Sequence, residues 1–318
     1  MLRSPRRFRE ILIDCKPALP RGAGKKSFDT LEIPAHPRGV RFSIVTPSYR
    51  SSAWLKLCIA SVADQPVELE HIVQDAGSDD GTLEWLLKDR RVQASVEKDR
   101  GMYDALNRGL QRAAGDILAC LNCDEQYLAG ALAAVAAFFE RHPETDVLFG
   151  DVVMIGPEGQ YLYHRKMQVP LKYHTWTCHL STLSCATFFR RRIVFDYGQL
   201  FDPRLRDVGD GEWMLRLLER GVTMAALGRF TSAFTRTGAN MSTGPNARRE
   251  AHELFRSAPW VARAVKPVTI LQHRLRRWLG GMYAQEPFAY EVFTPASPAR
   301  RQRFEVNRPT FRTGNGKT

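Results

Sequence analysis

The chain has 318 residues, of which 44% are hydrophobic and 25% charged, a composition typical of a globular protein long enough to bury a core. No apolar stretch reaches the roughly 20 residues that a helix needs to span a bilayer, and the first residues lack the apolar segment of a secretion signal. The net charge of +12 is uneven: residues 1–41 carry +6, residues 42–244 carry −3 and residues 245–318 carry +9.

Cysteine usage indicates a reducing compartment. Cys120 and Cys123 form a CxxC motif, but the sequence has no second pair to complete a zinc site, and Cys120 lies in a predicted strand. We interpret the thiols as structural and expect a cytoplasmic protein.

Strand and helix patterns alternate from residue 42 onward, after a basic extension over residues 1–41. β-branched and apolar runs predict strands at 42–46, 69–74, 92–99, 116–121 and 146–155. Apolar residues at helical spacing predict helices at 51–65, 82–89, 100–116 and 128–141. Short connections between alternating elements imply right-handed crossovers, so we expect an α/β fold with a mostly parallel sheet flanked by helices.

Polar residues follow four of these strands, at 48–50, 75–80, 99–101 and 122–125. Loops after parallel strands emerge at one edge of the sheet, where open α/β sheets bind ligands. The buried strand DILACL runs directly into Asp124 and Glu125. Adjacent carboxylates are costly unless they bind something positive, and a hard divalent cation is the usual partner.

The second half is less regular. We expect strands at 159–170 and 186–189, a helix at 191–197, a second helix with Trp213, Met214 and Leu217 inward, and two short strands within 222–238. Asp210 lies at the start of the second helix, where a carboxylate can also serve as a cap.

Several chemistries are excluded by missing motifs. The chain has no GxxxxGK[ST], no GxGxxG after the first strand, no GxSxG and no helical histidine pair. An acidic crevice on a parallel sheet remains. A cation at Asp124 and Glu125 could neutralise a diphosphate, and Asp75 and Asp99 could bind a base and a ribose, which points to a nucleoside diphosphate that carries a transferable group.

Four segments resemble family 2 glycosyltransferases in order and spacing: FSIVTPSYR, IVQDAGSDDGT, EKDRGMYDALNRGLQRAAGDILACLNCDEQY and ATFFRRRIVFDYGQLFDPRLRDVGDGEW. The resemblance covers roughly residues 42–240. It implies a GT-A fold, with a Rossmann-like sheet, and an inverting enzyme that uses a nucleotide sugar, most commonly a UDP-sugar. It further implies an acceptor that is a glycan or lipid-linked, in polysaccharide or glycolipid biosynthesis.

The resemblance also implies roles for individual residues. Thr46, Pro47 and Tyr49 match the first-strand loop that lines the nucleotide pocket, Asp75 matches a contact to base or ribose, and Asp99 with Gly101 matches the next nucleotide-side loop. Asp124 and Glu125 match the site for Mn²⁺ or Mg²⁺ and the diphosphate, with Glu125 in place of the usual aspartate. Asp210 matches the general base.

Some positions stay open. Asp207 and Glu212 compete with Asp210 as the base, and Ser184-Cys185 replaces a His-Gln pair on the acceptor side. Arg190 and Arg191 could contact diphosphate or be solvated charges at a helix start. Arg236 and the loop from Gly238 could form a lid or a plain flexible loop.

We expect three regions: an extension at 1–41, a glycosyltransferase domain at 42–243 and a basic, partly helical extension at 244–318. Within the last, 268–285 mixes apolar and basic residues, as in a helix on an anionic membrane surface or one packed on the domain. A catalytically impaired nucleotide-sugar-binding protein and a nucleotidyltransferase remain alternatives. We expect no nucleic-acid binding, because the basic residues lie in the extensions and the crevice is acidic.

Overall fold

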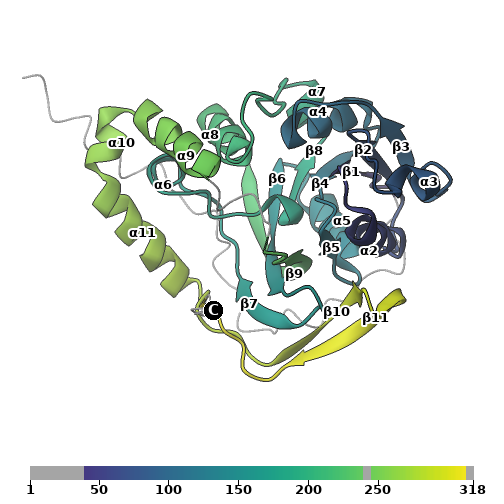
Figure 1. The fold of residues 1–318 in the computed structure, drawn as a ribbon. Coiled ribbons are helices and arrows are strands. Elements are labelled where there is room, and N and C mark those ends of the chain that lie inside the picture. The colour runs from purple at the N-terminus through teal and green to yellow at the C-terminus, as the bar shows by residue number, and fades with distance from the viewer. Residues whose placement is uncertain (1–38, 239–244, 313–318) are drawn as a thin grey trace, which may run out of the picture. The chain divides into compact units, whose positions relative to one another are not determined.

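The computed structural model describes residues 39–238 and 245–312, which belong to one compact unit. Within these residues a nine-stranded sheet has the order β3-β2-β1-β4-β8-β6-β9-β5, with β7 beside β6 (Figure 1). Its strands are β1 (Phe42–Ser48), β2 (Leu69–Asp75), β3 (Gln93–Val96), β4 (Ile117–Cys120), β5 (Glu125–Tyr127), β6 (Val147–Ile155), β7 (Tyr161–Arg165), β8 (Thr187–Arg190) and β9 (Met224–Thr235).

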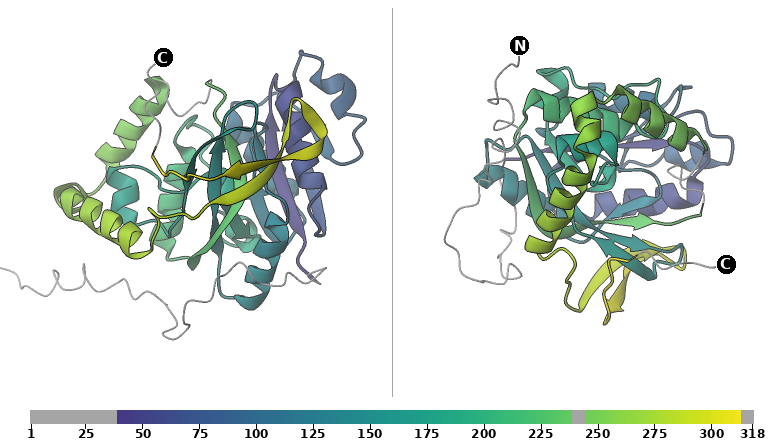
Figure 2. Two further views of the ribbon diagram at one scale, coloured as in Figure 1. Left: turned by 90° about the horizontal axis from the view of Figure 1, so that it is seen from below. Right: turned by 90° about the vertical axis from the view of Figure 1, so that its left-hand side faces the viewer.

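Helices flank this sheet. They are α2 (Ser52–Ala63), α3 (Thr82–Leu86), α4 (Met102–Arg112), α5 (Ala131–Arg141), α6 (Lys172–Thr177), the 3₁₀ turn η2 (Ser184–Ala186), α7 (Arg192–Phe195), α8 (Gly209–Arg220), α9 (Pro245–Ser257), α10 (Trp260–Ala264) and α11 (Lys266–Leu279). Figures 1 and 2 show α9, α10 and α11 grouped at one side of the sheet, beside α6 and α8. Every helix in the described ranges is too short or too polar to traverse a lipid bilayer.

The first half of the sheet confirms the predicted alternation. Strand β1 lies between β2 and β4, and β3, β2, β1 and β4 all run parallel. These strands are apolar and buried because helices cover both faces, apart from the shorter, partly exposed β3 at the edge. Gly115 lets the chain enter β4 next to β1, since a Cβ there would lie 2.6 Å from the Phe42 carbonyl carbon. The four polar loops therefore leave one edge of the sheet.

The second half mixes directions. Strand β8 is antiparallel to both β4 and β6, whereas β9 is parallel to β6 and antiparallel to β5. The two strands expected within 222–238 are one strand, β9, and that expectation is wrong. A register shift opposite Phe149 and Asp151, with Gly228 at φ 67°, interrupts the apolar pattern without ending the strand.

The carboxyl-terminal segment adds a hairpin that the sequence analysis did not predict. Strands β10 (Phe288–Thr294) and β11 (Ser297–Val306) pair antiparallel and lie below β5 and α2 in Figure 1. Gln126 of β5 exchanges two hydrogen bonds with the Phe293 backbone, and Arg301 donates to Asp64 at the end of α2. The hairpin thus packs on the strand that begins at Glu125.

Candidate active site

The loops after β1 and β2 are joined by Asp75. This carboxylate is fully buried and accepts four hydrogen bonds, from Ser48 Oγ, the Gly77 and Ser78 amides and Ser78 Oγ, at 2.7–2.9 Å. A carboxylate has about four acceptor sites, so these four hydrogen bonds occupy both oxygens of Asp75. In this conformation Asp75 shapes the loop, and its contact with a base or ribose stays a prediction.

The residues of the first-strand loop differ in position. Thr46 is fully buried, and its hydroxyl lies 2.8 Å from His71 Nε2, so it lies in the sheet interior rather than along the loop surface. Burial lowers the pKa of His71 to about 3, which keeps the imidazole neutral. Pro47 is half-buried, and Tyr49 is 52% exposed with the Arg50 guanidinium 5.1 Å from its ring centre. Of the three predicted residues, only Pro47 and Tyr49 are open to a ligand.

Asp99 closes the loop that leads into α4. Its Oδ1 accepts the Gly101 amide at 2.9 Å, and Gly101 has φ 136°, a conformation that favours glycine. Burial raises the pKa of Asp99, and the nearby charge of Asp75 acts in the same direction. The structure thus brings Asp75 and Asp99 close enough for their charges to interact, as expected for two parts of one pocket.

Asp124 and Glu125 follow β4, and Glu125 begins β5 rather than ending a loop. Glu125 is 1% exposed, and its Oε2 accepts the Asn122 amide at 2.8 Å. Its Oε1 has no hydrogen-bond partner within the described part of the chain. Burial and then the charge of Asp124 raise the pKa of Glu125 to about 8, and Asp210 contributes in the same direction. Burial also raises the pKa of Asp124, which is half-buried.

Asp210 lies in the first turn of α8 and contacts Tyr103 of α4. The Tyr103 hydroxyl donates to Asp210 Oδ1 at 3.4 Å and accepts the Asp210 amide at 3.1 Å. The Gly211 amide also donates to Oδ1, at 2.8 Å. Gly209 is needed here because a Cβ would lie 2.6 Å from the Tyr103 ring. Burial raises the pKa of Asp210, whereas these hydrogen bonds lower it.

The two competing carboxylates point elsewhere. Asp207 Oδ2 accepts from Asn246 Nδ2 at 2.5 Å. Glu212 forms an ion pair with Arg216 at 2.7 Å, one turn along α8. Asp210 therefore differs from both in having no cationic or amide side chain against its carboxylate in the described residues.

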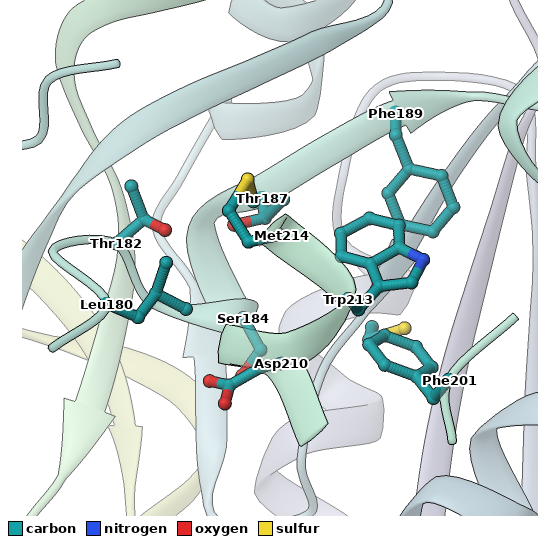
Figure 3. A pocket seen from close by; sticks show the side chains of 10 residues that line it. Leu180, Thr182, Ser184, Thr187, Phe189, Phe201, Asp210, Trp213 and Met214 are labelled. Carbon is teal, nitrogen blue, oxygen red and sulfur yellow. The ribbon is translucent and has the colours of Figure 1, made fainter. Parts of the chain in front are cut away.

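A pocket adjoins Asp210, as Figure 3 shows. Aromatic rings form one wall: the Trp213 ring centre lies 5.0 Å from that of Phe201 and 5.1 Å from that of Phe189. The lining residues are Cys120, Leu180, Thr182, Ser184, Thr187, Phe189, Phe201, Asp210, Trp213 and Met214. Asp210 and Ser184 lie close together in Figure 3, so the position where the sequence departs from His-Gln borders the pocket.

Sequence reasoning missed Tyr103, Leu180 and Thr182. Tyr103 lies within the helix predicted at 100–116 but has no predicted role, and the glycines on either side of Asp210 are the one signal that another side chain packs there. Nothing in the sequence near Leu180 and Thr182 marks them, since only the return of that segment to α8 brings them to Asp210.

Arg190 and Arg191 do not reach this edge of the sheet. Arg190 pairs with Ile117, at the start of β4, and its guanidinium donates to main-chain carbonyls, including that of Thr145 at 2.8 Å. Arg191 donates to the Ala113 carbonyl. Antiparallel pairing of β8 with β4 puts both at the opposite edge, so the diphosphate-contact interpretation is wrong. Most of the loop expected as a lid, from Gly238, lies outside the described residues.

Comparison with known proteins agrees with this architecture. The family model described as glycosyl transferase family 2 matches residues 43–198. A PGL/p-HBAD biosynthesis glycosyltransferase from Mycobacterium bovis is 38% identical over 187 residues, which cover 55% of this chain and 68% of the relative. The chain belongs to glycosyl transferase family 2.

Two further similar proteins extend the comparison. Glycosyltransferase AglE of Haloferax volcanii is 25% identical over 203 residues, covering 57% of this chain and 62% of that protein. The structure of S. aureus TarS 1-349 in complex with UDP-GlcNAc has a TM-score of 0.54 at 21% identity, over 67% of this chain. The chain covers 64% of that TarS chain, less than two thirds. This likeness confirms the GT-A fold.

Proposed function

We propose that this glycosyltransferase is inverting and transfers a sugar from a nucleoside diphosphate sugar to an acceptor hydroxyl, with Asp210 as the base. In the reaction the acceptor oxygen bonds to the anomeric carbon as its proton passes to the Asp210 carboxylate. The bond between the anomeric carbon and the phosphate oxygen breaks, and the nucleoside diphosphate leaves. Inversion requires the base and the leaving group on opposite sides of the sugar.

The observation that carries the proposal is the position of Asp210. It lines the pocket, whereas Asp207 and Glu212 are engaged by other side chains. Its charge acts on Glu125, which begins β5 beside the predicted diphosphate site. A buried carboxylate with a raised pKa is a better proton acceptor than an exposed one. The position of Asp210 and its raised pKa both support a role in deprotonating the acceptor hydroxyl.

Asp124 and Glu125 suit a divalent cation. The unpartnered Glu125 Oε1 and the half-buried Asp124 provide hard oxygen donors. No group of three histidine, cysteine or carboxylate side chains in the described ranges forms a complete metal site. Two carboxylates nevertheless fit Mg²⁺ or Mn²⁺, since such ions commonly take their remaining ligands from water and substrate phosphates. When bound, the ion would neutralise charge on the departing diphosphate.

The donor and acceptor follow from the same comparisons. TarS binds UDP-GlcNAc in its crystal structure, which supports a UDP-sugar as donor here. The Mycobacterium relative is named as a PGL/p-HBAD biosynthesis glycosyltransferase, and the pocket beside Asp210 has an aromatic wall. Both support an acceptor with an apolar part next to its hydroxyl, as in a glycolipid or lipid-linked glycan.

The test compares Asp210→Asn with Glu212→Gln in the same helix. The rate of donor turnover is measured as nucleoside diphosphate release from a panel of nucleotide sugars, with Mn²⁺ or Mg²⁺ present. We expect Asp210→Asn to lower kcat by about 10²–10⁴-fold with nucleotide binding unchanged, and Glu212→Gln to remain near wild type. Transfer that survives in Asp210→Asn would place the base elsewhere. Nucleotide binding without transfer in the wild type would favour the catalytically impaired alternative.

A further inference from the structure

Helix α11 packs with its polar side inward and its apolar side outward. Thr269 and His273, both polar, are its buried residues. Apart from the partly buried Ile270, its large apolar side chains are exposed by 49–69% and form what we call the α11 stripe: Val268, Leu271, Leu275, Trp278 and Leu279. A helix that stabilises a fold ordinarily shows the reverse pattern. The stripe therefore contributes little to the core and needs another explanation.

Polar contacts fix this orientation. His273 Nδ1 lies 2.9 Å from Gln168 Nε2, and its ring stacks on His174 with centres 4.0 Å apart. Arg276 and Arg277 each donate to a main-chain carbonyl of the segment that leads to α6, at 3.2 and 3.3 Å. The apolar side thus faces outward because the opposite side of the helix is held by specific hydrogen bonds.

The spacing makes the stripe one continuous surface. Steps of three and four residues from Val268 through Leu271, Leu275 and Trp278 place these side chains on one helix face. Trp260, at the start of the neighbouring α10, is 74% exposed. Soluble proteins rarely present several large apolar side chains together unless they bind something there. Tryptophan is enriched where proteins meet the bilayer interface.

The charge around the stripe identifies what would cover it. Residues 257–285 contain no acidic residue and five basic residues, of which Arg276 and Arg277 are hydrogen-bonded to the domain. Residues 1–41 are also basic, with a charge of +6, and a second copy would bring the same basic surface. The basic residues near the stripe would repel residues 1–41 and the same surface of a second copy. The anionic headgroups of a lipid bilayer would instead attract these basic residues. Arg263 and Arg274 are exposed and lie beside or near the stripe in sequence.

We infer that the α11 stripe docks on an anionic membrane surface. Leu271, Leu275 and Trp278 enter the boundary between headgroups and acyl chains, with α11 parallel to the bilayer, and the exposed Arg263 and Arg274 contact the headgroups. The catalytic domain is thereby held at the membrane surface by a helix that lies on the bilayer. This surface is separate from the carboxylate site, so the inference is independent of the proposed reaction.

Vesicle flotation of the full chain tests this inference. We expect binding to vesicles of phosphatidylcholine with 30% phosphatidylglycerol, weaker binding to phosphatidylcholine alone, and loss of the difference at high salt. Combining Leu271→Ser, Leu275→Ser and Trp278→Ser should lower binding by about ten-fold or more. Arg263→Gln with Arg274→Gln should reduce the preference for anionic vesicles.

A matched control uses three exposed apolar residues elsewhere, Leu87→Ser, Leu162→Ser and Phe195→Ser, which should leave binding unchanged. Circular dichroism confirms that each variant is folded. Equal binding by the α11 variant and wild type would overturn the inference, as would no binding by wild type. A wild-type dimer by light scattering that the α11 variant converts to monomer would assign the stripe to a second copy. Vesicle binding that appears only after deletion of residues 1–38 would show that this segment covers the α11 stripe in the full chain.

Discussion

Asp210 receives opposing influences from its surroundings. Burial raises the pKa of its carboxyl group, because a charge is poorly solvated there, whereas the Tyr103 hydroxyl and the Gly211 amide stabilise the ionised form and lower it. The balance is a pKa above the ordinary aspartate value of 3.8. A base must be deprotonated to act, so the reaction should slow as the pH falls through this pKa.

Tyr103→Phe tests this balance. Removing a hydrogen bond to the ionised carboxylate raises the pKa of Asp210 further, so the acidic limb of the kcat/KM profile should move to higher pH. The profile is measured between pH 4 and 9 on the wild type and variant. Tyr197→Phe, outside the pocket, is the control and should keep the wild-type limb. A limb that stays in place or moves to lower pH in Tyr103→Phe would contradict a positioning role for Tyr103.

At the scale of elements, one arginine holds the hairpin to the sheet domain. The side chain of Arg301 is 8% exposed, and its guanidinium donates to both oxygens of Asp64 at 2.5 and 2.7 Å. It also donates to the Tyr127 and Glu291 carbonyls, at 2.9 and 3.0 Å. Tyr127 belongs to β5, the strand that starts at Glu125, so Arg301 connects the carboxyl-terminal hairpin to the predicted metal site.

We expect Arg301→Leu to destabilise the chain by about 2–4 kcal/mol, because buried carbonyls and a carboxylate would lose their donor. Arg303→Leu, two residues along β11, is the matched control. Its side chain is 63% exposed and its ion pairs are 3.7 and 3.9 Å long, so the cost should be below about 0.5 kcal/mol. Chemical denaturation measures both. Equal effects would show that the guanidinium does not hold the hairpin.

Local patterns explain why some elements were predictable and others were not. Strands β1, β2 and β4 are continuous apolar runs covered on both sides, so their residues alone indicated them. Strand β5 has three residues, and its pairing with β9 supplies the hydrogen bonds that define it. The hairpin was hidden because β11 is rich in arginine and exposed along much of its length.

Across the whole molecule, the sequence predicts that the loops after the parallel strands meet at one edge of the sheet. It does not predict the side of the site that α8 and α4 form. The Ser48 to Asp75 hydrogen bond and the interaction of Asp99 with Asp75 agree with loops that meet where parallel strands end. The place of Asp210 in sequence was recognisable by resemblance. Its contact with Tyr103 forms only when α8 packs beside α4. The two residues are 107 positions apart in the chain, so no local sequence pattern predicts this contact.

The site as a whole carries an excess of negative charge. Asp99 interacts with Asp75, and Asp124 and Asp210 interact with Glu125, so a diphosphate would be repelled by the ionised carboxylates of this group unless a cation lies between them. We therefore expect nucleotide binding to depend on a divalent cation, whichever sugar is transferred.

Thermal unfolding with UDP measures this dependence directly. At about a hundred-fold excess over Kd, UDP with Mn²⁺ should raise Tm by about 4–5 °C, since binding to the folded state alone stabilises it by about 2.7 kcal/mol. UDP with EDTA, or uridine with Mn²⁺, should give a much smaller shift, because each removes one side of the charge pairing. Asp124→Asn should reduce the UDP shift, whereas Asp196→Asn, on the exposed end of α7, should retain it. An equal UDP shift in EDTA and in Mn²⁺ would mean that the chain's own cationic groups neutralise the diphosphate, and the cation would then be unnecessary for binding.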